Sequence, residues 1–338
     1  MKNKVLVLEI ISLLIIVIFC GCSEKQESYS IQQLIDRASP GDIINIKSGT
    51  YNENIIINKK LSLVGWNKEN TIINGNGNNT VTIDINAFNV VFTGFTVKNG
   101  LFLVAQSTYN NISNNIFENS WVRLYMHYST SWTIGSSFNR ISNNIFRIGG
   151  IDSVDSFNNT IDNNTIFGNG QWQEGISLSG GYSNVVSDNT IYNTSLYGIY
   201  IGGNSNIITG NIINGNNDIG INVNGADGNI IKNNNIENNK IGIELQQDIS
   251  NNTIFLNNFI NNGQNSDDNT GMYQINPTFK NNFYNEEINK GNYWDDYITR
   301  YPNATKNGDI WDTPYKIMVQ KWELLESDKY PLVNRVDI

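Results

Sequence analysis

The charged side chains that could perform chemistry together lie in the middle of the chain. Asp152 and Asp155 are close in sequence, and Arg123 precedes them. Two carboxyl groups that face each other can hydrolyse a glycosidic bond. Acids that hold calcium, together with a group that removes a proton, can instead perform elimination or epimerisation. One hypothesis is therefore a polysaccharide lyase or epimerase acting through these three residues. The other is a surface ion pair, which an arginine beside an aspartate usually forms.

Aromatic side chains are concentrated in the same part of the sequence. They are Trp121, Tyr125, Tyr128, Trp132, Trp172, Tyr182, Tyr192, Tyr197 and Tyr200. Residues 206–250, by contrast, contain none. Aromatic rings with a few polar groups are a usual lining of ligand sites, and sugar rings suit such a lining. The glycan-binding candidates are Trp121, Arg123, Tyr125, His127, Asp152, Trp172, Glu174, Tyr197 and Tyr200. Alternatively, some of these rings pack inward or cover strand edges.

A repeated motif predicts the elements that position these side chains. Asn-x-Ile occurs seven times, with its isoleucine at Ile116, Ile145, Ile166, Ile191, Ile213, Ile236 and Ile260. Steps of this length, between about 20 and 30 residues, are the signature of a stacked-repeat protein. Alternating β-branched residues predict two or three short strands in each period. A glycine precedes the second strand at Gly175, Gly198, Gly220 and Gly242. These glycines are expected to supply a turn conformation.

Stacking the periods as rungs of a coil buries their apolar faces and brings equivalent residues together. Asparagines that lie over one another can form a hydrogen-bonded ladder. The predicted ladder is Asn114, Asn143, Asn164, Asn189, Asn211, Asn234 and Asn258. The predicted outward row on the second strand is Arg123, Asp152, Ser177, Tyr200, Asn222 and Glu244. The longest period predicts an extra loop over residues 129–138, beside Trp172 and Glu174.

Segments at both ends carry a family resemblance. They are residues 31–38, 40–42, 49–51 and 61–65, then Gly-Asn-Tyr-Trp-Asp-Asp-Tyr at 291–297, Asp-Thr-Pro-Tyr at 312–315 and Tyr-Pro-Leu at 330–332. With the repeats, they make residues 30–335 similar to pectin-lyase-like proteins and, more narrowly, to NosD-like surface and periplasmic proteins. The resemblance implies an all-β, single-stranded, right-handed parallel β-helix of about ten coils with Asn ladders. It also implies a short N-terminal capping helix and an irregular C-terminal cap. Fold alone does not assign an activity.

The family name also implies copper, whose ligands are His, Met or Cys. Outside the first 22 residues the chain has one histidine, His127, and three methionines, Met126, Met272 and Met318. Neighbours on a strand point to opposite faces, so the sequence predicts no metal site and no cofactor. The family's C-terminal calcium-like loop corresponds to residues 303–312, where Lys306 replaces an acid. Calcium therefore stays only as an alternative.

The N-terminus predicts export. Two lysines precede an apolar run over residues 5–19, which is typical of a secretory signal. A glycine before Cys22 resembles a lipoprotein cleavage site, so Cys22 is a predicted lipidation site. An uncleaved membrane anchor and plain secretion are the alternatives. The predicted organisation is a signal at 1–22, a tether at 23–29, a β-helix at 30–285 and a capping segment at 286–338. Both cysteines lie in the signal, so the body has no disulfide.

The charge balance excludes one class of partner. Only 16% of the residues are charged and the formal net charge is −9, which disfavours nucleic acid. The sequence therefore predicts an exported, lipid-anchored protein of the cell surface or periplasm. Its predicted role is non-catalytic binding of a polysaccharide or another cell-surface glycan. The alternatives are the polysaccharide lyase or epimerase described above and an accessory protein for a metalloenzyme.

Overall fold

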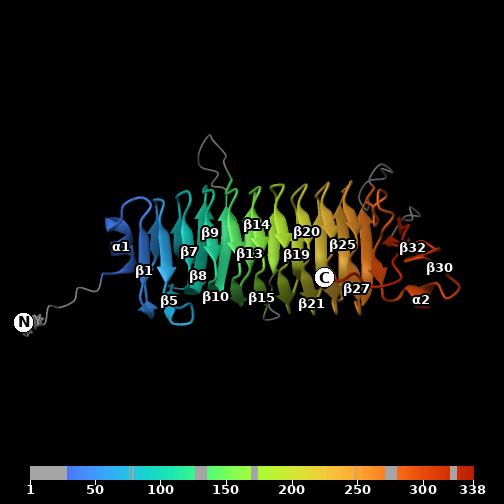
Figure 1. Ribbon diagram of the computed structural model, residues 1–338, viewed down its shortest axis with the longest axis horizontal. Helices are drawn as coiled ribbons and strands as arrows, with labels where there is room; N and C mark the ends of the chain where they lie inside the picture. Colours follow the sequence, from blue (N-terminus) through green and yellow to red (C-terminus); the bar gives the residue numbers. More distant parts are fainter. Residues whose placement is uncertain are drawn as a thin grey trace, which may run out of the picture.

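The computed structural model describes residues 29–75, 77, 80–125, 135–168, 174–247, 249–270, 280–319 and 326–338. These residues form an elongated rod of short strands that lie side by side from one end to the other (Figure 1). All strand pairs along the body of the rod are parallel, so the predicted stack of rungs, a parallel β-solenoid, is confirmed. The predicted signal, its Cys22 and tether residues 23–28 lie outside the described residues.

One face of the rod is a ten-stranded sheet. In order, its strands are β1 (Ile43–Ile46), β4 (Ser62–Gly65), β7 (Val91–Thr93), β9 (Asn111–Ser113), β11 (Arg140–Ser142), β14 (Thr160–Asp162), β17 (Val185–Ser187), β20 (Ile207–Thr209), β23 (Ile230–Lys232) and β26 (Thr253–Phe255). Ten strands give one strand to each rung, in agreement with the predicted number of coils.

The other strands follow two further faces. The second face holds β2 (Gly49–Tyr51), β5 (Thr71–Asn74), β12 (Ile145–Arg147), β15 (Thr165–Phe167), β18 (Thr190–Tyr192), β21 (Ile212–Asn214), β24 (Asn235–Glu237), β27 (Asn258–Ile260) and β29 (Tyr293–Trp294). The third holds β3 (Ile55–Ile57), β6 (Val81–Ile85), β13 (Ile151–Val154), β16 (Ile176–Ser179), β19 (Tyr197–Ile201), β22 (Ile219–Asn224), β25 (Ile241–Gln247), β28 (Gln264–Thr270) and β33 (Met318–Val319). The longer β8 (Thr96–Ala105) and β10 (Ile116–Tyr125) contribute to both faces, because β10 pairs with β12 and then with β13.

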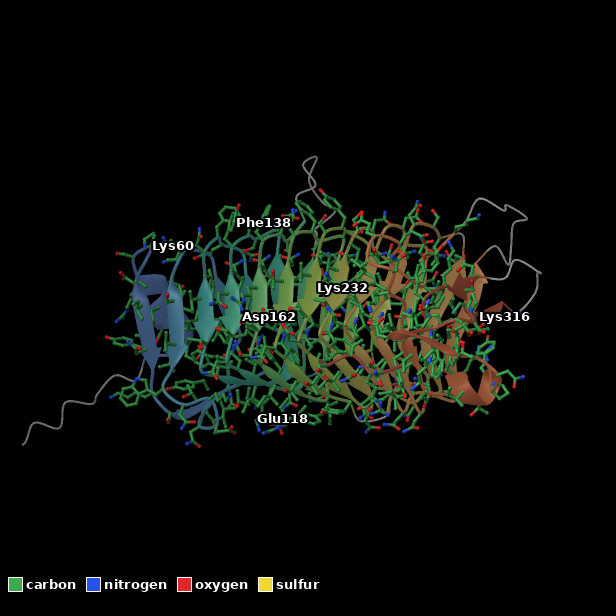
Figure 2. All side chains as sticks on the ribbon, turned by 45° about the vertical axis from the view of Figure 1, so that its right-hand side comes forward. Lys60, Glu118, Phe138, Asp162, Lys232 and Lys316 are labelled. Carbon is green, nitrogen blue, oxygen red and sulfur yellow. The ribbon has the colours of Figure 1, made fainter. Side chains whose placement is uncertain are left out.

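The core is a continuous column of apolar side chains inside the rod. In one rung, Ile161, Ile166 and Ile176 come from the three faces, and all three are fully buried. Burial of one such side chain contributes about 1.5–3 kcal/mol. Alternate side chains point outward, and Asp162 and Lys232 lie on the outside of the ten-stranded sheet (Figure 2). The strand pattern of the sequence therefore separates core from surface within each rung.

Asparagine ladders run through the buried corners. The Nδ2 atom of Asn189 donates to Oδ1 of Asn211 at 3.0 Å, and Nδ2 of Asn211 donates to Oδ1 of Asn234 at 2.9 Å. The full ladder is Asn115, Asn144, Asn164, Asn189, Asn211, Asn234, Asn257 and Asn292. A second ladder comprises Asn110, Asn139, Asn159, Asn184, Asn206, Asn229, Asn252 and Asn281. The ladders satisfy amides that would otherwise be buried without partners.

The predicted ladder is wrong by one residue at three positions. Asn114 and Asn143 have a φ of 57° and form the left-handed bend before Asn115 and Asn144, which occupy the ladder. Asparagine tolerates this backbone better than most residues. At the C-terminal end Asn258 begins β27, and its side chain instead bonds to Asn235 and to the backbone of Val336. At Asn114–Asn115 and Asn143–Asn144, therefore, the first asparagine forms the bend and the second forms the ladder hydrogen bonds.

The glycines before the second strand act differently from the prediction. Gly175, Gly198, Gly220 and Gly242 are not among the left-handed residues. A Cβ on Gly198 would lie 2.7 Å from the carbonyl oxygen of Gly220, and a Cβ on Gly220 would lie 2.6 Å from that of Gly242. Glycine is needed here because neighbouring rungs approach closely. The predicted turn conformation is wrong for these four positions.

Caps cover both ends of the stack. Helix α1 (Ile31–Arg37) begins at a capping box made by Ser30 and Gln33, and it buries Ile31 and Ile35 against the first rungs. At the other end the Trp294 ring stacks on Phe259 of the preceding rung at 4.4 Å. The further elements of this cap are α2 (Tyr297–Arg300), β30 (Lys306–Asn307), β31 (Ile310–Trp311), β32 (Tyr315–Lys316) and β34 (Ser327–Asp328). Such covers protect strand edges from pairing with other chains.

A buried carboxylate joins the C-terminal cap to the ladder. Asp328 is fully buried, and its Oδ2 accepts hydrogen bonds from Asn292 N at 2.6 Å and Trp294 Nε1 at 2.9 Å. Its Oδ1 accepts from Tyr330 N at 2.9 Å. Burial raises the pKa of Asp328 to about 7, against the lowering effect of these donors. The last residue of the ladder is thus held by a group that titrates near neutral pH.

Candidate functional site

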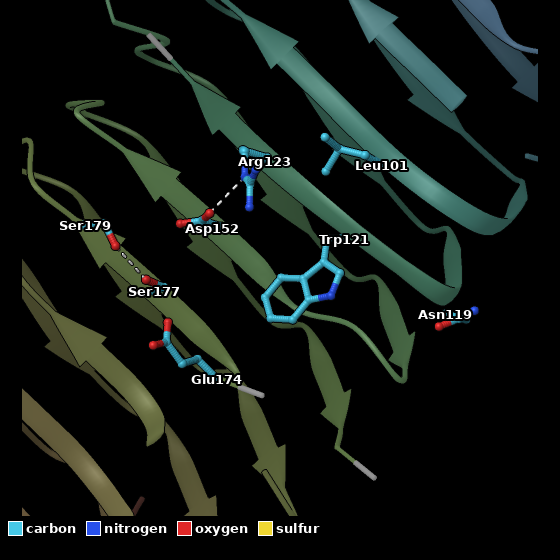
Figure 3. Close-up of a pocket in the computed structure, with 8 residues that line it drawn as sticks. All are labelled: Leu101, Asn119, Trp121, Arg123, Asp152, Glu174, Ser177 and Ser179. Carbon is cyan, nitrogen blue, oxygen red and sulfur yellow. Dashed lines mark hydrogen bonds and ion pairs between the residues drawn. The ribbon is translucent and has the colours of Figure 1, made fainter. Parts of the chain in front are cut away.

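An open groove lies on the third face, over β8, β10, β13 and β16 (Figure 3). Its volume is about 490 Å³, within the usual range for small-molecule sites. Its lining residues are Leu101, Asn119, Trp121, Arg123, Asp152, Glu174, Ser177 and Ser179. Four of the predicted glycan-binding candidates, Trp121, Arg123, Asp152 and Glu174, are therefore brought together. We call this site the Trp121 groove.

The register of the strands places one outward residue from each rung in line. Arg123 pairs with Asp152, Asp152 with Ser177, and Ser177 with Tyr200. The row continues through Asn222 to Glu244. The register of all six positions of the predicted row is thus confirmed, although Ser177, Asn222 and Glu244 are buried rather than exposed. Because strands stack about 4.8 Å apart, side chains that are 20 to 30 residues apart in sequence become neighbours here.

An ion pair forms one wall of the groove. Nε of Arg123 donates to Oδ2 of Asp152 at 2.9 Å. The Arg123 side chain is 42% exposed and that of Asp152 is 15% exposed. Burial raises the pKa of the Asp152 carboxyl, and Arg123 offsets this only in part. The pair therefore fixes a guanidinium and a carboxyl group at the surface of the groove.

A tryptophan forms the apolar part of the groove. Trp121 pairs with Leu101 on the preceding rung, and the following rung has Gly150 beneath its ring. A Cβ on Gly150 would lie 2.9 Å from Cζ3 of Trp121. The absence of a side chain at Gly150 leaves room for the indole, which lies among Leu101, Arg123 and Glu174 in Figure 3. The groove thus presents an aromatic ring beside polar groups.

The far wall of the groove is acidic and rich in hydroxyl groups. Glu174 precedes β16, and its pKa is raised by burial and by the charge of Asp152, while the Ser177 hydroxyl lowers it. The Oγ atoms of Ser177 and Ser179 are 2.9 Å apart. Leu101, Asn119 and Ser179 also line the groove, and none of them was predicted from the sequence. Asn119 and Ser179 lie two residues from Trp121 and Ser177 on the same strands, and Leu101 pairs with Trp121 from the preceding rung. Two-residue alternation and strand register would therefore have identified all three.

Two tyrosines continue the site on the next rung. The rings of Tyr197 and Tyr200 stack at 5.6 Å. Burial raises the pKa of both hydroxyls, and the charge of Glu174 raises both further. Tyr200 pairs with the groove residue Ser177, so the two stacked tyrosines lie one rung beyond the groove. Tyr125, the remaining described candidate, ends β10 in a half-buried position paired with Ala105.

Two tyrosines of the aromatic concentration, and an acid that follows Asp155 in sequence, lie elsewhere. Tyr182 stacks on Phe157 at 5.0 Å, and Tyr192 of β18 stacks on Phe167 of the second face at 5.6 Å. Asp162 pairs with Arg140 on the ten-stranded sheet. The aromatic residues therefore do not form one surface, because adjacent strands of a rung face different directions.

Several candidates lie outside the described residues. They are His127, Trp172, Tyr128, Trp132, Met126, Met272 and most of the predicted loop at 129–138. Within the part of the chain that the structure describes, no group of three His, Cys, Asp or Glu residues could hold a metal ion. In the predicted calcium run, Asp312 accepts hydrogen bonds from the Thr305 backbone and hydroxyl. Likewise, none of the described helices is long and apolar enough to cross a membrane.

Comparison with known proteins gives one family and several relatives. The model of the family described as periplasmic copper-binding protein (NosD) matches residues 127–298. A cell surface glycoprotein of Methanothermus fervidus is 37% identical over 103 residues, which are 29% of this chain and 17% of that protein. An alginate lyase in complex with G6 has 16% identity and a TM-score of 0.46, over 72% of this chain and 58% of that one. The catalytic domain of a GH87 α-1,3-glucanase with nigerose has 17% identity and a TM-score of 0.44, over 76% and 66%. These structural likenesses carry no functional assignment.

Proposed function

The chain belongs to the family described as periplasmic copper-binding protein (NosD), and from this premise we propose that it is an exported protein that binds a glycan in the Trp121 groove. The observation that carries the proposal is the Trp121 ring over Gly150, beside the Arg123–Asp152 pair and Glu174. An aromatic ring with a few oriented polar groups is a usual ligand surface. The family description and the cell-surface relative support a location outside the cytoplasm.

The strand register supports binding on a rigid surface. Trp121 and Arg123 belong to β10, whose partners on both sides fix their spacing. A preorganised surface loses less conformational entropy when a ligand binds. The described residues offer no set of copper ligands, so the proposal includes no step through copper. Binding thus depends on the groove alone.

We further propose that the protein is held at the membrane by a lipid on Cys22. The sequence Gly-Cys after an apolar run supports this anchor. Cys22→Ser should move the protein from the membrane fraction to the soluble exported fraction. Unchanged fractionation of this variant would contradict the anchor without affecting the groove.

Truncating the tryptophan tests the binding role. Trp121→Ala should weaken binding to the glycan that the wild-type protein selects on a broad array by about tenfold or more, since truncating a tryptophan that anchors a binding surface typically costs about 2 kcal/mol or more. The melting temperature should fall by only a few degrees, because the Trp121 ring is half-buried and lies outside the core. Trp66→Ala is the matched control, because Trp66 is 63% exposed at the N-terminal end of the rod. A wild-type protein that binds nothing on the array would overturn the proposal.

A second candidate function rests on the two acids of the groove. Asp152 and Glu174 both have raised pKa values, and the charge of Asp152 acts on Glu174. Perturbed acids in a groove are candidates for general acid or base catalysis. A polysaccharide lyase or epimerase would then use Asp152 near Arg123, whereas Asp155 lies in the turn after β13 with its carboxylate toward Gly180. New ultraviolet absorbance from an unsaturated product, lost in Asp152→Ala, would favour a lyase over a binding protein.

A further inference from the structure

The Trp121 groove carries more negative than positive charge. Of the described residues that line it, Asp152 and Glu174 are acidic and Arg123 is the only base. The Arg123 guanidinium already donates to Asp152 at 2.9 Å. The acid that remains after this pairing is Glu174. A ligand that entered the groove would therefore meet one carboxylate without a charge-neutralising base among the lining residues.

The surroundings of Glu174 are aromatic and hydroxylic. Trp121 lines the same groove, and Tyr200, which stacks on Tyr197, pairs with the groove residue Ser177 from the next rung. The Ser177 hydroxyl acts on this carboxylate and lowers its pKa, and a carboxylate offers several acceptor positions on its two oxygens. A carboxylate among aromatic rings is suited to a ligand ammonium group, because the ring faces and the carboxylate both attract positive charge.

We propose that the groove takes a glycan that carries ammonium groups, such as a glucosamine polymer, in preference to neutral or uronate chains. This inference rests on the proposed glycan-binding function. The ammonium group donates to Glu174 while the sugar ring packs against Trp121. A uronate would instead bring a third carboxylate close to Asp152 and Glu174, and like charges at this separation repel. The ligand class follows from the charge balance of the lining residues.

Three oligomers of equal length test the ligand class. Binding of the full chain to six-residue oligomers of glucosamine, N-acetylglucosamine and galacturonate should be measured by calorimetry at a pH where most glucosamine is protonated. We expect glucosamine to bind at least about tenfold more tightly than N-acetylglucosamine, the effect of one charge-assisted hydrogen bond. Galacturonate should bind most weakly. Added salt should weaken glucosamine binding and leave N-acetylglucosamine binding nearly unchanged.

Removing the charge of Glu174 tests the preference for ammonium groups separately from glycan binding itself. Glu174→Gln should reduce the preference for glucosamine over N-acetylglucosamine by about tenfold and leave N-acetylglucosamine binding intact. Glu69→Gln, at an exposed position away from the groove, is the matched control and should change neither. Tightest binding of the neutral or the uronate oligomer, or of a different glycan altogether, would overturn the inference alone. A protein that binds no glycan would overturn the proposed function itself.

Discussion

Polar side chains inside the rungs differ from those outside the same rungs. Inside, Asn189, Asn211 and Asn234 repeat one residue type, since each amide must donate to one neighbour and accept from another. On the other side of the backbone, the row that begins with Arg123 and Asp152 changes residue type at every step. The difference teaches that residue types repeat where they hold the stack together. Residue types vary in the row on the other side of the backbone, where side chains need not hydrogen-bond to identical side chains in the neighbouring rungs.

Breaking the ladder should have the largest effect. Asn211→Ala leaves the buried Asn189 backbone N–H without its acceptor and removes the amide that donates to Val186 O, Thr209 O and Asn234 Oδ1. We expect the free energy of unfolding to fall by about 3–5 kcal/mol, because unsatisfied buried groups are costly. Denaturant titration measures the loss. Asn217→Ala, an exposed position in the same rung, should cost less than about 1 kcal/mol. Equal losses in both variants would contradict the contrast between inside and outside.

The C-terminal end of the ladder should respond to pH. Asp328 has a folded-state pKa of about 7 against an ordinary value of 3.8, so the folded protein binds one more proton between these values. Stability from this group is therefore present below about pH 4 and is lost as the pH rises to about 7, by up to roughly 4 kcal/mol.

Melting curves between pH 4 and pH 8 check this sign. Asp328→Asn should be less stable than the wild type at low pH, because an amide nitrogen cannot accept from Asn292 N and Trp294 Nε1. The difference in melting temperature between the two proteins should shrink as the pH rises. Parallel curves for the two proteins would show that Asp328 does not titrate in this window.

Breaking the outer row should have the smallest effect on stability. Arg123→Met removes an ion pair whose arginine is 42% exposed, so the free energy of unfolding should change by less than about 1 kcal/mol. Arg140→Met, which removes the pair with Asp162 on another face, is the matched control. Urea titration of both variants provides the measurement. A loss as large as that of Asn211→Ala would assign Arg123 to the architecture of the rod.

The fold could be predicted from the sequence because its signal is repeated. A single rung is ambiguous, but seven copies of Asn-x-Ile specify both the period and the residues that superimpose. The same alignment predicted the outward row correctly, since strand pairing preserves register. It failed at some pairs of adjacent asparagines, as at Asn114 and Asn115, although it chose the ladder residue correctly at Asn164 and Asn234. Only one of them can occupy the ladder while the other makes the bend.

The groove could be predicted in part. Arg123 and Asp152 stand in the predicted outward row, whereas Trp121 and Glu174 were candidates because aromatic and acidic residues gather in this part of the sequence. The role of Gly150 was invisible, because nothing in the sequence shows which neighbouring side chain fills the space above a glycine. The direction of Tyr182 and Tyr192 was also missed, since it depends on which of three faces each short strand joins.

The spacing of the second ladder has a consequence for how such rods change length. Asn184, Asn206, Asn229 and Asn252 follow one another at offsets of 22, 23 and 23 residues. Loss or duplication of one whole period would rejoin equivalent positions and leave the stacking intact. Each such event would shift the C-terminal cap by one strand spacing, about 4.8 Å. The number of rungs on each side of the groove therefore determines how far the groove lies from each end of the rod.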